Sequence, residues 1–407
     1  MKKVKYNVVI GKNFGDEGKG MAVDMLSTDA GRTVVIRHNG GSQSGHTVEK
    51  DDIRFVFHAL GSGSLRGADT FWADTFYPDL YKLGEECSAF LALTGFVPRI
   101  YAMPDAQITL IDDVLLNMAA EVARGADRHG SCGMGIYEAY CRSEAGFAVT
   151  VEELVHMNSE QLVMRMAEIR RQYVPVRLAA LGFGDKYALP EEYAELLENS
   201  AVLENAAESI LANLKYVQII TDVKAFLDSY DTVIFENGQG LLLDSENTEF
   251  APHVTASRTG LHNPVAFLSR FGFVPERVVY VTRSYVTRHG AGPLPFECKS
   301  EHLGIEGSDL TNIPNPWQES LRYASHGTIT DFIKPVAKDL SLLPERGNKC
   351  ECMLLITHLN ETDGKILLKE EALDAEGLVC RLECETVFDS IAESFTRFSK
   401  DIIVKDF

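Results

Sequence analysis

A glycine-rich loop near the start of the chain limits the folds that are open to this sequence. Residues 11–20 read GKNFGDEGKG, after the short apolar run Lys5–Gly11 and before the helix-like segment Lys19–Leu26. A strand, a glycine-rich turn and a helix in this order are typical of an α/β protein. Glycine lets the backbone approach a phosphate closely, the amides at a helix start point towards an anion, and Lys19 can neutralise a terminal phosphate. The loop therefore predicts a phosphate site.

The same loop carries an acidic residue that a simple phosphate site does not need. Asp16 would repel phosphate unless a metal ion or a proton transfer makes use of its carboxylate. The loop also lacks the GK[ST] ending of the common nucleotide-binding loop, which argues against a P-loop kinase. The plain alternative is a glycine-rich turn with a solvated Asp16–Glu17 pair.

A second loop of the same kind follows the strand-like run Thr33–Arg37. Residues 38–47 read HNGGSQSGHT, so two glycines and small polar residues precede His46. A lone histidine is more often structural than catalytic. Paired glycines directly after a strand favour a histidine that is carried into a phosphate site.

Short apolar runs alternate with helical patterns along the whole chain. Further strand candidates lie at 53–57, 99–103, 232–235, 277–281 and 353–357, and helical patterns at 111–123, 153–171 and 191–214. Strands separated by helices predict an α/β fold with a large, mostly parallel central sheet flanked by helices. We expect a single α/β domain over residues 1–407 with helical insertions at approximately 143–230.

The charge balance restricts the class of partner. The chain has 39 Lys and Arg against 59 Asp and Glu, a formal net charge of −20, so a nucleic-acid-binding surface is not expected. The sequence contains no long uncharged apolar run, so we expect no membrane helix. The opening MKKVKYNVVIG does not resemble a signal peptide. With eight cysteines and no predicted leader, we expect a reducing, cytoplasmic location.

Five segments in order resemble the signature loops of the adenylosuccinate synthetase family. They are GKNFGDEGKG, GGSQSGHT, the segment 130–136 (GSCGMGI), the segment 235–255 (FENGQGLLLDSENTEFAPHVT) and the segment 287–297 (TRHGAGPLPFE). The resemblance spans residues 1 to about 300. It implies that fold, a homodimer, and a ligase that joins L-aspartate to the 6-carbon of a 6-oxopurine nucleoside monophosphate. The reaction uses Mg²⁺ and a nucleoside triphosphate, and it passes through a 6-phosphoryl intermediate.

The resemblance also implies roles for individual residues. Asp16 would take the proton from ring nitrogen 1 and, together with Gly45, bind Mg²⁺. His46 would donate to the transferring phosphoryl group, Lys19 would neutralise the triphosphate, and Gln239 would bond the base. The donor nucleotide would contact Gly15, Glu17, Gly18, Gly20, Gly45, Thr47, His358 and Asn360. The acceptor nucleotide and aspartate would contact Gln43, Ser131, Cys132, Arg142, Thr255, His289, Gly290, Thr311, Asn312 and Arg322.

Three departures from the family pattern bear on specificity. The family's arginine-rich aspartate loop, TTGRxRRxGWLD, becomes TNIPNPWQESLR at 311–322, and its GTTGRG loop becomes GSCGMG. The guanine-reading KLD motif becomes His358-Leu359-Asn360, and the chain ends before any late STG segment appears. A phage and archaeal branch that resembles this family acts on dGMP, and some of its members replace the loop aspartate by serine, whereas this chain keeps Asp16.

Several alternatives therefore stay open at the level of the sequence. The acceptor is IMP, GMP or dGMP, and in the last case the product is a 2-aminoadenine precursor. The donor is GTP or ATP. The amine is aspartate or, because the aspartate loop is altered, another amine. The alternative to an enzyme is a catalytically inactive paralogue that binds nucleotides. The joint presence of Asp16, Lys19, His46 and Gln239 argues for catalysis instead.

Overall fold

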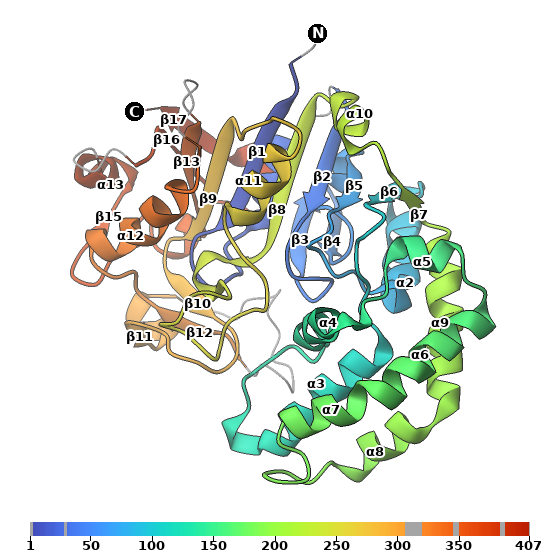
Figure 1. Cartoon of the computed structure of the whole chain (residues 1–407). Helices are drawn as coiled ribbons and strands as arrows, with labels where there is room; N and C mark the ends of the chain where they lie inside the picture. Colours follow the sequence, from blue (N-terminus) through green and yellow to red (C-terminus); the bar gives the residue numbers. More distant parts are fainter. Residues whose placement is uncertain (1–2, 28–30, 306–319, 345–349, 383–386, 407) are drawn as a thin grey trace.

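A ten-stranded sheet runs through the centre of the computed structural model, which describes residues 3–27, 31–305, 320–344, 350–382 and 387–406 (Figure 1). The strand order is β17-β16-β13-β9-β1-β8-β2-β5-β6-β7, and neighbouring described strands are parallel except β16 and β17. The strands are β1 Lys5–Gly11, β2 Thr33–Arg37, β5 Asp69–Trp72, β6 Ile100–Ala102, β7 Val217–Ile219, β8 Thr232–Gly240, β9 Arg277–Arg283, β13 Glu351–Thr357, β16 Ser390–Glu393 and β17 Ile403–Asp406. The predicted fold class is confirmed.

Strand β1 lies near the middle of the sheet because its sequence is apolar on both faces. Every residue of β1 after Lys5 is buried, as expected for a parallel strand that is covered on both sides. Val8 pairs with Phe235 of β8 on one side and with Val278 of β9 on the other. The loop at residues 11–20 therefore leaves the sheet between two neighbouring strands.

Helices cover both faces of the sheet. Alternate residues of β1, among them Val8, pack against α10 (Val223–Asp228), α11 (His262–Ser269), α12 (Ile329–Leu340) and α13 (Ala375–Leu382). Val9 faces the opposite side and packs with Ala22 and Val23 of α1 (Lys19–Leu26). Figure 1 shows α11 and α12 lying across the sheet beside β9 and β13.

A group of helices extends from the β5–β7 edge of the sheet (Figure 1). Apolar clusters hold these helices to the sheet edge and to one another, and α4 packs against Tyr77 in a small cluster of its own. They are α2 Leu80–Thr94, α3 Ile111–Arg124, α4 Ile136–Arg142, α5 Val151–Val155, α6 Ser159–Gln172, α7 Val174–Ala180, α8 Glu191–Glu198 and α9 Ser200–Leu214. Most of the predicted helical insertion at 143–230 corresponds to this group.

Two of the predicted helices are interrupted, and asparagine is the cause in both. The segment 153–171 divides because the Asn158 side chain accepts the Gln161 amide and begins a new helix, α6. The segment 191–214 divides at Asn199, whose side chain accepts the Ala201 amide at the start of α9. Asparagine is among the best helix-capping residues, so each break is encoded locally.

In the part of the chain that the structure describes, three small antiparallel sheets accompany the central one. The pair β3 (His46–Lys50) and β4 (Ile53–Phe57) forms one sheet. The others are β10-β12-β11 (Val286–Arg288, Arg322–Ala324, Glu297–Cys298) and β14-β15 (Ile366–Leu367, Ala372–Leu373). None of the helices in the described part of the chain has the length and apolar character needed to cross a membrane.

Candidate active site

A cleft of about 560 Å³ opens at the carboxyl ends of the central strands, where open α/β sheets bind their ligands. The two glycine-rich loops predicted to bind phosphate both line it, together with segments after β8, β9, β13 and β16. The predicted site residues on its wall are Gly15, Asp16, Gly18, Lys19, Gly20, Gln43, Gly45, His46, Thr47, Cys132, Gln239, His289, His358 and Asn360. Residues far apart in the sequence are thus brought together.

Glu17 organises the first loop from inside. Its carboxylate is buried and accepts the amides of Asn13 at 2.9 Å and Gly15 at 2.8 Å, and the Lys19 ammonium at 3.1 Å. Burial opposes ionisation of Glu17, but Lys19 and the two amides hold its pKa below its usual value. We therefore assign Glu17 a structural role, in place of the predicted contact with the donor nucleotide.

Asp16 is displayed at the surface of the loop. Its backbone has a φ of 62°, in the left-handed region that non-glycine residues rarely adopt, and its side chain is 27% exposed. Arg283, at the end of β9, donates through Nε to the Asp16 carbonyl oxygen at 2.6 Å. The Asp16 carboxylate lies 3.7 Å from Nε2 of His289. Glu17 and Arg283 thus hold the loop from two sides, and the Asp16 carboxylate faces the cleft.

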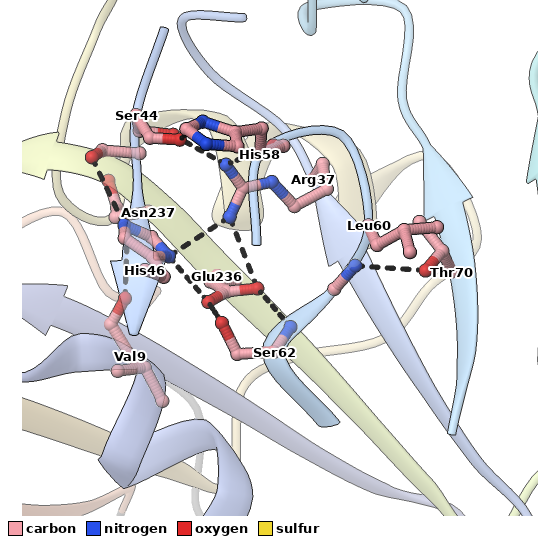
Figure 2. A network of polar contacts seen from close by, with 12 residues as sticks. Val9, Arg37, Ser44, His46, His58, Leu60, Ser62, Thr70, Glu236 and Asn237 are labelled. Carbon is pink, nitrogen blue, oxygen red and sulfur yellow. Dashed lines mark hydrogen bonds and ion pairs between the residues drawn. The ribbon is translucent and has the colours of Figure 1, made fainter. Parts of the chain in front are cut away.

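A buried ionic network fixes His46 (Figure 2). The imidazole Nδ1 lies 2.6 Å from Oε1 of Glu236, on β8, and the same carboxylate lies 3.2 Å from the Arg37 guanidinium. Ser62 donates its hydroxyl and its amide to Glu236. Because Nδ1 is committed to the carboxylate, Nε2 is the ring nitrogen left on the cleft side, 3.3 Å from the Gly238 carbonyl.

The network also sets the protonation of its members. Burial lowers the pKa of His46, and the Glu236 carboxylate opposes that shift. Burial alone would raise the pKa of Glu236, but Arg37 and His46 hold it well below its usual range. The sequence analysis assigned no role to Glu236 or Arg37. The available signals were that Arg37 directly precedes the second loop and that Glu236 lies inside the motif at 235–255.

Two amide side chains meet above Gly40. A Cβ atom built on Gly40 would lie 2.6 Å from Gln239 Nε2 and 3.0 Å from Gln43 Nε2, so a larger residue would displace both. Gln239 Nε2 and Gln43 Oε1 are buried and have no hydrogen-bond partner among the residues that the structure describes. Buried polar groups are nearly always satisfied, so this donor and this acceptor are suited to a polar ligand such as a base edge.

The loop that contains Ser131 and Cys132 is braced by helix α3. Glu121 accepts the amides of Gly130 at 2.8 Å and Ser131 at 3.2 Å, and Asn117 pairs with the Ser131 hydroxyl at 2.9 Å. These donors are therefore already engaged. The Cys132 side chain lines the cleft, and burial raises the pKa of its thiol, so it is present there as a neutral group.

Arg142 lies away from the cleft. Its guanidinium is 1% exposed, binds the Asp113 carboxylate at 3.0 Å, and donates to the carbonyls of Ile108 and Phe147. Because these donors are committed inside the fold, Arg142 has a structural role in place of the predicted substrate contact.

The other predicted substrate residues are placed as follows. Arg322 pairs with Glu297 and donates to the carbonyls of Gly290 and Gly292, so its guanidinium supports the β10-β12-β11 sheet. Ser131, Thr255 and Gly290 are absent from the described cleft wall. Thr311 and Asn312 lie outside the described residues.

Comparisons with known proteins identify the family. The sequence model described as adenylosuccinate synthetase matches residues 8–315. The adenylosuccinate synthetase of Teredinibacter turnerae is 31% identical over 74% of this chain and 68% of its own length, and that of Penicillium rubens is 29% identical over 75% and 68%. The chain belongs to the adenylosuccinate synthetase family. It is therefore a ligase of purine nucleotide biosynthesis that forms a carbon–nitrogen bond.

Two solved structures share the fold over nearly the full length of the chain. An adenylosuccinate synthetase from Plasmodium falciparum superposes with a TM-score of 0.69, at 17% identity, over 98% of this chain and 99% of its own. A succinoaminodeoxyadenylate synthetase from cyanophage S-2L superposes with a TM-score of 0.59, at 15% identity, over 98% and 95%. The match to the family's sequence model ends at residue 315, whereas the structural similarity continues through the C-terminal part of the chain that the structure describes.

The part of this chain beyond residue 315, where the sequence departs from the family, forms one end of the cleft. His358, Asn360 and Glu361 follow β13, and Thr396 and Arg397 follow β16. Arg397 pairs with Glu49 of β3 at 2.9 Å. No motif in the sequence marked the loop after β16, which the order of strands in the sheet brings to this end of the cleft.

Oxygen ligands for a magnesium ion are present in the first two loops. Asp16 offers a partly exposed carboxylate, and Gly45 lines the same cleft with its backbone. Within the described ranges, no cluster of three or more His, Cys, Asp or Glu side chains forms a metal cage. One carboxylate with a carbonyl suits Mg²⁺, which usually keeps few protein ligands and takes the remainder from substrate phosphates and water.

Proposed function

We propose that the chain joins L-aspartate to the 6-carbon of a 6-oxopurine nucleoside monophosphate by way of a 6-phosphoryl intermediate. The observation that carries this proposal is the convergence of Asp16, Lys19, His46 and Gln239 on one cleft. A carboxylate, a cation, a histidine and an unsatisfied amide together supply a base, charge neutralisation, a donor and base recognition.

In the first step, the 6-oxygen becomes a nucleophile. The Asp16 carboxylate takes the proton from ring nitrogen 1, and the 6-oxygen then attacks the γ-phosphorus of the donor, whose nucleoside diphosphate leaves. Lys19 neutralises the charge of the phosphate oxygens. His46 donates a hydrogen bond from Nε2 to the phosphoryl group as it is transferred. Donation from Nε2 while Nδ1 stays on Glu236 requires the imidazolium form. Burial lowers the pKa of His46, and the Glu236 carboxylate together with a bound phosphate would favour the protonated ring against that shift.

In the second step, the amine of aspartate attacks the 6-carbon. The carbon–nitrogen bond forms, phosphate leaves with the former 6-oxygen, and the amine loses a proton. Mg²⁺ bound at Asp16 and Gly45 would neutralise phosphate charge and orient the donor.

We propose that the acceptor is guanylate or deoxyguanylate rather than IMP. The cyanophage S-2L enzyme that shares this fold binds dGMP. Gln43 Oε1, a buried acceptor without a described partner, suits the 2-amino group that guanine has and hypoxanthine lacks. Incubation with Mg²⁺, aspartate and a donor, followed by mass spectrometry, will detect the succinylated product. Product from IMP alone would contradict this choice and leave the ligase chemistry intact.

We propose that the donor is an adenine nucleotide. Asn360 replaces the aspartate that reads guanine in the family motif, and its amide presents a donor and an acceptor that match the 6-amino edge of adenine. Wild type should turn over with ATP about tenfold faster than with GTP, and N360D should reduce or reverse that ratio. Equal rates with both donors in wild type and in N360D would contradict the choice.

Substitution of Asp16 separates a ligase from an inactive nucleotide-binding paralogue. D16N should lower kcat by about 10²–10⁴-fold, because the amide cannot take the proton, while nucleotide binding persists. Asp51 provides a matched control, since it is also an aspartate with a positive φ, of 53°, but lies in the exposed β3–β4 turn. Tight nucleotide binding without turnover by wild type would favour the inactive paralogue.

We also propose that the protein is a homodimer, as the resemblance to the family implies. Sedimentation velocity at micromolar concentration will test this. A single species at the mass of one 45.0 kDa chain would contradict it.

A further inference from the structure

A buried tyrosine lies between a cation and a carboxylate beside the cleft. Tyr285 is 1% exposed, and its hydroxyl receives a hydrogen bond from Arg283 Nη1 at 3.0 Å. The same hydroxyl donates to Oε2 of Glu361 at 2.5 Å. Burial raises the pKa of Tyr285, so the hydroxyl keeps its proton at neutral pH. Since a hydroxyl has one hydrogen, the two bonds have a fixed direction, from Arg283 through Tyr285 to Glu361.

The two ends of this chain of bonds touch different parts of the cleft. At one end, Arg283 Nε donates to the carbonyl of Asp16. At the other end, Glu361 lines the cleft next to Asn360, where we place the donor base. Three consecutive hydrogen bonds therefore connect the donor-base end of the cleft to the backbone of the proposed catalytic base.

The bond to Asp16 acts on a conformation that needs support. A φ of 62° is costly for a residue with a side chain, and it persists where surrounding groups determine it. Glu17 accepts the neighbouring amides of Asn13 and Gly15, but its carboxylate has no hydrogen to donate to the Asp16 carbonyl. Arg283 is the described side chain that holds this carbonyl, and Tyr285 restricts the position of its guanidinium.

We propose that Glu361, Tyr285 and Arg283 form a positioning chain that couples occupancy of the donor-base end of the cleft to the orientation of Asp16. A base bound at Asn360 brings N–H donors to the Glu361 carboxylate. These donors compete with the Tyr285 hydroxyl and so weaken the hydrogen bond from Tyr285 to Glu361. The change passes through the tyrosine hydroxyl to the guanidinium and so to Asp16. This inference rests on the proposed function, because it takes Asp16 as the base.

A double-mutant cycle tests the coupling. Y285F and E361Q should each lower kcat about tenfold, with the KM of the acceptor changed less than twofold. The double variant Y285F/E361Q should lose no more than the worse single variant, because each change breaks the same chain. A loss equal to the product of the two single losses would overturn the proposal.

A matched control separates positioning from stability. Tyr230 is also buried, and its hydroxyl donates to the Asp69 carboxylate at 2.6 Å outside the cleft. Y230F should reduce thermal stability about as much as Y285F does, but it should leave kcat unchanged. If Y285F lowers stability and leaves kcat at the wild-type value, the positioning role is wrong.

Hydrogen exchange gives a second readout that does not need turnover. In wild type, Mg²⁺ with the non-hydrolysable donor AMP-PNP should slow amide exchange in the peptide that contains residues 12–17. In Y285F, the slowing should be at least halved. Equal slowing in both proteins would overturn the chain. If wild type makes no succinylated product, the proposed function fails, whereas this exchange comparison still decides whether the chain exists.

Discussion

Residues of the first loop pack so closely that a larger side chain does not fit at Gly11. Gly11 ends β1 directly beneath the Glu17 carboxylate, and a Cβ atom there would lie 2.2 Å from Glu17 Oε2. Glu17 in turn holds the amides on both sides of Phe14. Glycine is therefore required at this position for packing, because a Cβ atom would collide with the Glu17 carboxylate.

We expect the G11A variant to displace Glu17 and release the loop amides. Displacement of a loop by about 1 Å can cost about 10² in rate, so kcat/KM should fall by about that factor. G377A is the control, because Gly377 lies in α13, away from the cleft, and its added Cβ would be 3.1 Å from Asp374 Oδ1. Steady-state kinetics of both variants will check this, and near-normal kinetics of G11A would contradict it.

Glu236 is the residue whose loss should change the pH profile. E236Q removes the carboxylate that raises the pKa of His46, so that pKa should fall further. If protonated His46 is the active form, the decline of kcat with rising pH should move to lower pH in E236Q. An unchanged profile would show that His46 does not act as an acid. Arg37 would also lose its buried partner, so a loss of about 3–5 kcal/mol in the free energy of unfolding should accompany the change.

At the scale of elements, α3 supports the cleft indirectly. Asp113 near its start binds Arg142 of α4, and Glu121 near its end braces the loop at residues 129–131. Both contacts are buried and both lie behind the cleft wall. The helix thus holds a cleft-lining segment in place without lining the cleft itself.

The R142M variant tests this structural assignment. Removal of the guanidinium leaves Asp113 buried without its partner, which should cost about 3–5 kcal/mol in the free energy of unfolding. The KM of the nucleoside monophosphate should stay within about twofold of wild type below the unfolding temperature. Urea unfolding and steady-state kinetics will measure the two effects. A tenfold rise in that KM with little loss of stability would restore the substrate contact.

At the scale of the whole molecule, buried histidines link stability to pH. Burial lowers the pKa of His38 to about 3 and that of His326 to about 3. Both ring nitrogens of His38 lack a hydrogen-bond partner among the described residues. Between the folded pKa and the ordinary value, the unfolded chain binds more protons, so stability should fall as the pH falls below about 6.5.

We expect each of these two histidines to remove about 2 kcal/mol of stability between pH 7 and pH 5. Chemical unfolding at both pH values will measure the change. The double variant H38Q/H326Q should be less stable at pH 7 but should show a flatter dependence on pH. If its pH dependence matched that of wild type, other groups would be responsible.

The sequence alone was enough for the fold class and for the two glycine-rich loops, because their signals are local. A buried parallel strand is a continuous apolar run, and a phosphate loop is a strand, glycines and a helix start in succession. The five ordered motifs added the family, which the comparisons confirm. The breaks at Asn158 and Asn199 are also local, and attention to capping would have predicted them.

Only the tertiary structure decided which side chains meet. Glu236 binds His46 across 190 residues, and Arg283 reaches Asp16 across 267. No local pattern marks such a pair, because it depends on the order of strands in the sheet. The same reason explains why Arg142, which lies near a motif in sequence, belongs to a buried ion pair, while the divergent loop after β16 completes the cleft.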